Sequence, residues 1–333
     1  MPFFVSLWQC IFNFVFITLN LNRNILLALK LIIFILMTWF IADQLFLKND
    51  FKAQFSFFVQ HLNAGKAWLI VPAVLLMPVN WGLETVKWKM LLNTKASYSN
   101  LIKSIIAGIT FGFVTPGRSG EFVGRAMFLD EDDKAKVFYL SSIGGLAQTA
   151  ASLAIGVPVV YFWHDIPFLY GIVLGAAVIY LFLFFRFDLL NRLIYAISFL
   201  QRYGLVIQHE DLPAIGIQTR VLLLSGIRFL VYSFQYVLLL MFFGLGTDYM
   251  GLLVHSIVFL LAQTVSPMMP LLDVSVRGGI ALLVFKDYTT NNIAVLSAVM
   301  LVWLINLVLP ALAGYLFILR RNAWANPGHR FTD

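Results

Sequence analysis

Cysteine and charge are both scarce in this sequence. Cys10 is the only cysteine among 333 residues, which excludes an intramolecular disulfide and any metal cluster held by several thiolates. Charged residues make up 12% of the chain, whereas 61% of its residues are hydrophobic. This balance is unlike that of soluble globular or disordered proteins. We therefore expect an integral membrane protein.

Motifs for nucleotide and metal chemistry are also missing. Neither GxGxxG nor GxxxxGK followed by Ser or Thr occurs, and the five histidines are isolated, without HExxH spacing. The 23 Lys and Arg against 16 Asp and Glu give a net charge of +7, but these charges lie singly between apolar runs. We therefore expect no cofactor, no metal and no nucleic acid.

Six apolar runs are long enough to cross a hydrocarbon core about 30 Å thick. They cover residues 25–47, 67–88, 137–163, 168–185, 221–245 and 293–319. We expect an all-α polytopic protein with a single transmembrane domain over 25–321. An interfacial segment (1–24, with a helix over 3–19) should precede this domain, and a cytoplasmic tail (322–333) should follow it. Basic residues, concentrated after the second, fourth and sixth runs, predict cytoplasmic N- and C-termini at the cell (inner) membrane.

Two further apolar segments are interrupted by proline. Residues 101–129 contain Pro116 and Gly117, and residues 252–285 contain Pro267 and Pro270. Each arm is roughly 12 to 16 residues, too short for a full crossing at about 1.5 Å per residue. The pattern therefore predicts two re-entrant hairpins, which transporters and channels tolerate around watery cavities.

The two interrupted segments align when the sequence is shifted by 152 residues. The shift places Glu121 on Asp273 and Arg125 on Arg277, so each segment has an acid followed four residues later by an arginine. Three predicted crossings separate the segments, so the second should enter from the opposite side. The sequence thus predicts an inverted repeat, with copies over about 25–163 and 168–319.

The first hairpin carries the main candidate site. Arg118, Glu121 and Arg125 recur at i, i+3 and i+7, which predicts one polar stripe on a helix. The glycines one position earlier predict a face that packs closely against a neighbour, and they are Gly117, Gly120 and Gly124. The break at Pro116 lets a helix begin inside the protein, where its N-terminus attracts anions, and arginine forks suit phosphate.

The hairpin sequence PGRSGEFVGR, together with NWGLETVKWKMLL at residues 80–92, resembles the transmembrane region of the lysylphosphatidylglycerol synthase family, also called flippase-like integral membrane proteins. The resemblance covers roughly residues 25–319. The second hairpin departs from the commoner family form, in which a Pro-Gly-Gly-rich stretch precedes the acid. Members with the full activity carry a soluble aminoacyl-transferase domain after the membrane part, whereas this sequence stops shortly after Arg321. The resemblance therefore implies movement of a lipid between leaflets and not lipid synthesis.

The leading hypothesis is a flippase-like lipid transporter for a phospholipid or a polyprenyl-phosphate-linked lipid. Arg118, Arg125 and Arg277 would hold the phosphate, while Glu121 and Asp273 would balance charge or bind a proton or a cationic head group. The acid–arginine pairs can instead be purely structural.

The residues at the end of the second run have two interpretations. Glu84 and Lys87 are either part of the substrate site or an interfacial pair. The tryptophans, mostly near run ends, suggest an aromatic belt.

Two other functions stay open from the sequence. One is a membrane enzyme acting on a lipid phosphate, with Glu121 as general acid or base. The other is a non-catalytic membrane subunit of a lipid-modifying enzyme. The expected partners are an anionic or phosphate-containing membrane lipid, and either a second copy of the chain or a separate lipid-modifying enzyme.

Overall fold

The computed structural model describes residues 35, 39, 51–115, 118, 120–129, 134–163, 167–186, 213–246, 248–265 and 273–320. Within these ranges every regular element is a helix, and there is no strand. The predicted interfacial segment, the C-terminal tail and nearly all of the first predicted span lie outside the described residues. So do Pro116, Gly117, Pro267 and Pro270.

Four helical stretches are long and apolar enough to cross a membrane, which indicates an integral membrane protein. The first comes after α3 (Phe51–His61) and η2 (Leu62–Lys66), and it begins with the short helix η3 (Ala67–Leu69), which leads into its main helix. The four consist of α4 (Ile70–Leu92), α7 (Lys134–Trp163), α11 (Ile215–Phe242), and α14 (Asn292–Trp303) continued by the π-helical turn η7 (Leu304–Val308) and α15 (Leu309–Arg320).

These stretches match four of the six predicted spans. The predicted span over 168–185 is also a helix, α8 (Pro167–Phe185), and is among the shorter apolar ones. The start of α11 differs from the prediction, because the helix begins at Ile215 and not at Val221. Arg220, which directly precedes the predicted span over 221–245, therefore lies within the helix.

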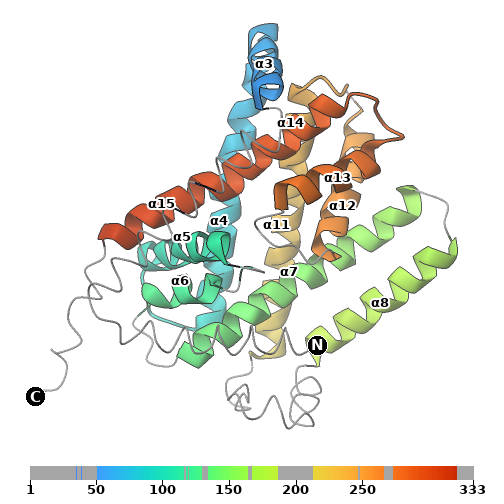
Figure 1. Ribbon diagram of the computed structural model, residues 1–333. Coiled ribbons are helices and arrows are strands. Elements are labelled where there is room, and N and C mark those ends of the chain that lie inside the picture. The colour runs from blue at the N-terminus through green and yellow to red at the C-terminus, as the bar shows by residue number, and fades with distance from the viewer. Residues whose placement is uncertain are drawn as a thin grey trace, which may run out of the picture.

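The first interrupted segment folds as two helices packed side by side, α5 (Tyr98–Val114) and α6 (Glu121–Met127) (Figure 1). Ser104 Oγ donates a hydrogen bond of 2.6 Å to the carbonyl oxygen of Arg125, which joins the two helices. A Cβ atom on Gly124 would collide with the backbone of Ala107, and one on Gly108 would lie 2.8 Å from the Glu121 carbonyl oxygen. The two backbones are thus in direct contact, which only glycine permits here.

The second interrupted segment also gives two helices, α12 (Tyr249–Val265) and α13 (Asp273–Phe285). Its bounds follow the sequence repeat, because α6 begins at Glu121 and α13 begins 152 residues later, at Asp273. The lengths of the second arms differ, with 7 residues in α6 and 13 in α13. The arm after the first break is therefore shorter than the sequence predicts, since Phe128 already leaves helical geometry.

Each helix pair packs against the last long helix of the other half of the chain. α5 packs against α15, where Thr110 Oγ1 donates a hydrogen bond of 2.8 Å to the carbonyl oxygen of Ala311. α12 packs against α7, where Gly156 lies against Leu261. Figure 1 shows α4 and α11 between these two groups, and those two helices form the largest contact in the fold. The two halves are therefore interlocked around α4 and α11.

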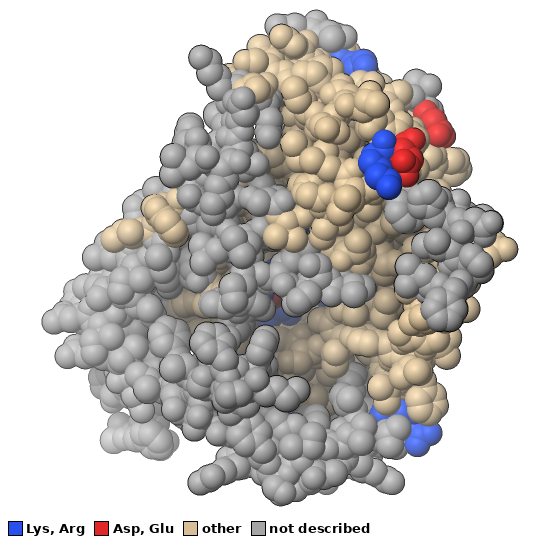
Figure 2. Space-filling model, turned by 45° about the vertical axis from the view of Figure 1, so that its right-hand side comes forward, with Lys and Arg blue, Asp and Glu red and all other residues tan. Residues whose placement is uncertain are grey.

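The described surface on the face drawn in Figure 2 is mostly uncharged, which suits a lipid environment. On the face drawn in Figure 2, the Lys, Arg, Asp and Glu side chains among the described residues gather near the upper and lower edges, with an uncharged surface between them. A hollow at the centre of this face has charged atoms at its floor.

Candidate functional site

Glu84 on α4 lies at the centre of a buried network of charged side chains. Its side chain accepts bonds from three cations and the residue is only 3% exposed. Oε1 accepts from Arg125 Nη2 at 2.9 Å, and Oε2 accepts from Lys87 Nζ at 2.6 Å and from Arg228 Nη1. One carboxylate thus holds together α4, α6 and α11.

Glu121 extends this network toward the break between α5 and α6. Its Oε1 accepts from Arg125 Nη2 at 2.6 Å, and its Oε2 lies 3.2 Å from Arg118 Nη2. Glu121 and Arg125 share one face of α6, as their spacing predicts. The predicted stripe is wrong for Arg118, which precedes α6 and has a left-handed backbone with φ of 57°. Its side chain is 46% exposed, so the network ends at an accessible guanidinium.

Lys87 closes the opposite, buried end of the network. Its residue is 2% exposed, and Nζ donates to the carbonyl oxygen of Gly144 at 3.2 Å as well as to Glu84. Glu84 and Lys87 therefore lie within the protein interior and not on its outer surface.

Arg228 on α11 is held by neutral as well as charged groups. Nε donates to Asn80 Oδ1 at 2.8 Å, and Nη1 donates to Gln148 Oε1 at 3.2 Å. These contacts join α11 to α4 and α7. The guanidinium is thereby fixed in position before any ligand binds.

Two tryptophans lie close to the guanidinium groups of Arg125 and Arg228. The Cζ atom of Arg125 lies 5.0 Å from the ring centre of Trp88, and that of Arg228 lies 5.7 Å from the ring centre of Trp81. Trp88 and Trp303 are buried, so the predicted aromatic belt is wrong for both of them. Trp68 is 65% exposed, as a belt residue would be.

The network carries more positive than negative charge. Among the described residues its ion pairs join four cations, Lys87, Arg118, Arg125 and Arg228, to two carboxylates, Glu84 and Glu121. With every group ionised, two positive charges remain. Unbalanced charge inside a membrane domain is costly and usually marks a substrate or ion pathway.

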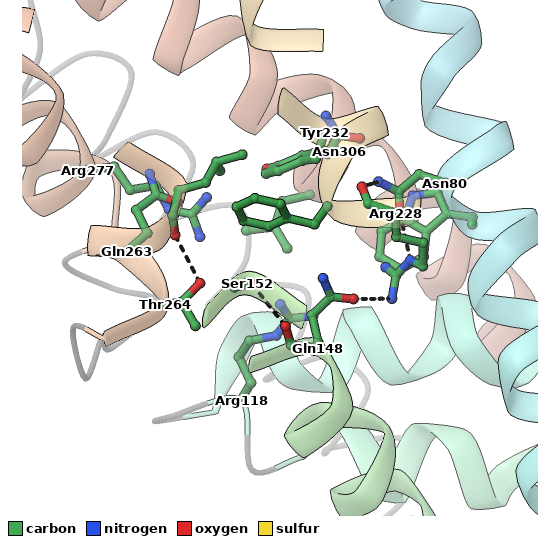
Figure 3. Close-up of a pocket in the computed structure, with 14 residues that line it drawn as sticks. Asn80, Arg118, Gln148, Ser152, Arg228, Tyr232, Gln263, Thr264, Arg277 and Asn306 are labelled. Atoms are coloured by element: carbon green, nitrogen blue, oxygen red, sulfur yellow. Dashed lines mark hydrogen bonds between the residues drawn. The ribbon is translucent and has the colours of Figure 1, made fainter. Parts of the chain in front are cut away.

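A cavity of about 320 Å³ opens beside this network (Figure 3). Three arginines line it, one from the break before α6, one from α11 and one from α13: Arg118, Arg228 and Arg277. Figure 3 shows Arg277 and Gln263 on one side of the cavity, Arg228 and Asn80 on the other, and Arg118 between them. Amide, hydroxyl and apolar side chains complete the described lining, which includes no Asp or Glu. The chemistry of this lining favours an anion.

The structure brings together most of the residues predicted for the site. Glu84, Glu121 and Arg125 lie in the network, Arg118 lies in both the network and the cavity wall, and Arg277 lies in the cavity wall. Asp273 begins α13, but its side chain lies outside the described part of the structure. Gly120 and Gly124 face α5 and not the cavity.

Sequence reasoning missed Arg228 and Gln148. A lone arginine near the middle of the apolar helix α11 is a signal that could have found Arg228, because intramembrane charges are costly and functional. Gln148 offers no such signal, since a single glutamine in an apolar helix is unremarkable in sequence.

Among the described residues, no group of three or more His, Cys, Asp and Glu side chains could hold a metal ion. Comparison of the chain with models of protein families, with curated proteins and with solved structures finds no match.

Proposed function

We propose that this protein moves a phosphate-containing lipid between the two leaflets of a membrane. The observation that carries the proposal is the cavity lined by Arg118, Arg228 and Arg277. Guanidinium groups bind phosphate oxygens in bidentate geometry, and here they come from three different segments of the chain. The resemblance of the first hairpin to flippase-like proteins agrees with this function.

The cavity offers surroundings for both parts of a lipid. The arginines and amides supply donors for a phosphate and its polar substituent, while Phe229, Leu260 and Leu307 supply apolar wall for the start of the hydrocarbon chain. A largely apolar cavity with a few placed polar groups is typical of small-molecule sites.

The arrangement of the two halves supports an alternating mechanism. Arg118 precedes α6 and Arg277 lies on α13, so the two equivalent helix pairs each contribute one arginine to the same cavity. We propose that the α5–α6 and α12–α13 pairs are re-entrant hairpins of an inverted repeat. Rocking of one half against the other would then expose the cavity to each leaflet in turn.

The experiment is leaflet exchange in proteoliposomes that contain head-group-labelled lipids. Arg118→Asn removes the charge, and asparagine tolerates the left-handed backbone better than most residues. We expect this variant to insert normally and to lose at least about tenfold in exchange rate, because charge-assisted contacts to phosphate are worth roughly 1.5 to 3 kcal/mol.

Arg220→Ala is the matched control, because Arg220 is an exposed arginine on α11 that does not line the cavity. Its exchange rate should equal that of the unaltered protein. Equal rates for Arg118→Asn and Arg220→Ala would refute the assignment of the cavity as the lipid site. A chemically altered lipid in the same vesicles would instead show a membrane enzyme.

A further inference from the structure

We propose that the cavity selects lipids by head-group charge, and that its preferred ligand ends in a phosphate monoester. Phosphodiesters should bind more weakly, and head groups that carry an ammonium more weakly still. This inference rests on the proposed function, since it names the substrate class of the same cavity.

The first step is the position of the unbalanced charge. Among the residues that the structure describes, the ion-paired network has two more cations than carboxylates, and two of its cations, Arg118 and Arg228, line the cavity. The other two, Lys87 and Arg125, are buried behind Glu84. The excess of two charges thus equals the number of network cations that a ligand can reach.

The second step is the charge of the ligand. A phosphate monoester carries nearly two negative charges at neutral pH, because its second pKa is about 6. It also has three oxygens that are not esterified. A phosphodiester carries one charge and has two free oxygens. The monoester therefore neutralises the excess of the network and can bond to guanidinium groups on opposite sides of the cavity.

The third step is that the described part of the cavity lining offers no carboxylate to a cation. Both oxygens of Glu84 and of Glu121 already accept from cations, and neither carboxylate lines the cavity. The described lining offers amides in place of acids, and Nε2 of Gln263 is a buried donor with no hydrogen-bond partner. An ammonium in this cavity would thus face arginines and amide donors without a counter-charge among the described lining residues.

The test compares lipids that share the same acyl chains and differ in head group. The full-length protein in neutral detergent is titrated with phosphatidate, phosphatidylglycerol, phosphatidylethanolamine and lysylphosphatidylglycerol, and bound lipid is counted by native mass spectrometry. We expect phosphatidate to bind about tenfold more tightly than phosphatidylglycerol, since one additional charge a few ångströms from a guanidinium gains at least that much. The two amine-bearing lipids should bind more weakly than phosphatidylglycerol.

Variants separate charge from shape. Arg118→Asn should reduce the preference for phosphatidate to about threefold or less, because one of the two accessible excess charges is gone. Arg118→Lys should preserve the order of the lipids, and Arg220→Ala should change nothing.

The two proposals fail in different ways. Equal binding of phosphatidate and phosphatidylglycerol, or tightest binding of an amine-bearing lipid, would overturn the charge selection while leaving a lipid site. No binding of any of the four lipids by folded protein would overturn the proposed function itself.

Discussion

Glu84→Gln tests whether one carboxylate holds the centre of the protein together. The substitution keeps the size and shape of the side chain but removes its charge. Lys87, Arg125 and Arg228 would lose their shared partner, and Glu121 would remain as the only carboxylate of the network described above. The excess of positive charge would rise from two to three.

The magnitude follows from the burial of these groups. Glu84 and Lys87 are at most 3% exposed, so water cannot replace the lost interaction. Removing one member of a buried ionic network costs about 3–5 kcal/mol, because it leaves an uncompensated buried charge. At about 2–4 °C per kcal/mol, the midpoint of thermal unfolding should fall on the order of 10 °C.

The assay is thermal unfolding of the purified protein in detergent, followed by tryptophan fluorescence. Asp287→Asn is the matched control, because the Asp287 side chain is 59% exposed. Its Oδ2 atom lies 3.9 Å from Nζ of Lys286, whose side chain is similarly exposed. The midpoint of this control should stay within about 1 °C, since exposed pairs are worth at most about 1 kcal/mol.

A second substitution distinguishes charge from lost packing. Lys87→Met added to Glu84→Gln returns the excess charge to two and should recover part of the lost stability. A Glu84→Gln midpoint within about 1 °C of the unaltered protein would refute the role of Glu84 as the central acceptor.

Two further substitutions test the packing around the site. Gly124→Ala should destabilise the protein by about 1–3 kcal/mol, because the added methyl group meets the backbone of α5. Gly145→Ala is the control and should not destabilise the protein, because a Cβ atom on Gly145 has no neighbour within 4 Å. Equal midpoints for these two variants would contradict the close approach of α5 and α6. Asn306→Ala removes the 2.6 Å bond to Gln235 Oε1 in the buried interior and should cost about 1–3 kcal/mol in the same assay. A loss below about 0.5 kcal/mol would show that Gln235 finds another donor.

The long helices of the fold can be predicted from local patterns in the sequence. Long apolar runs predict α4, α7, α11 and the final stretch, because the length and hydropathy of a run decide whether it can cross a membrane. The repeat offset predicts the start of α13 from that of α6. Exact helix ends were less predictable, as α6 and the start of α11 show, since tertiary contacts decide where a helix begins or ends.

The candidate site was only partly predictable, for a different reason. Spacing alone places Glu121 and Arg125 on one helical face. The pairing of Arg228 with Glu84 joins residues 144 positions apart, and no local pattern encodes such a partner. The backbone of Arg118 was missed because a helical stripe assumes continuous helix, whereas the chain takes a left-handed step there.

The contact between α5 and α15 has a consequence for how the protein is made. Thr110 and the carbonyl oxygen of Ala311 that it contacts are 201 residues apart. At about 5–20 residues per second, a ribosome adds Ala311 roughly 10 to 40 s after Thr110. The face of α5 that receives α15 therefore stays without that partner throughout this interval, and the first helix pair can reach its final packing only after α15 has been made.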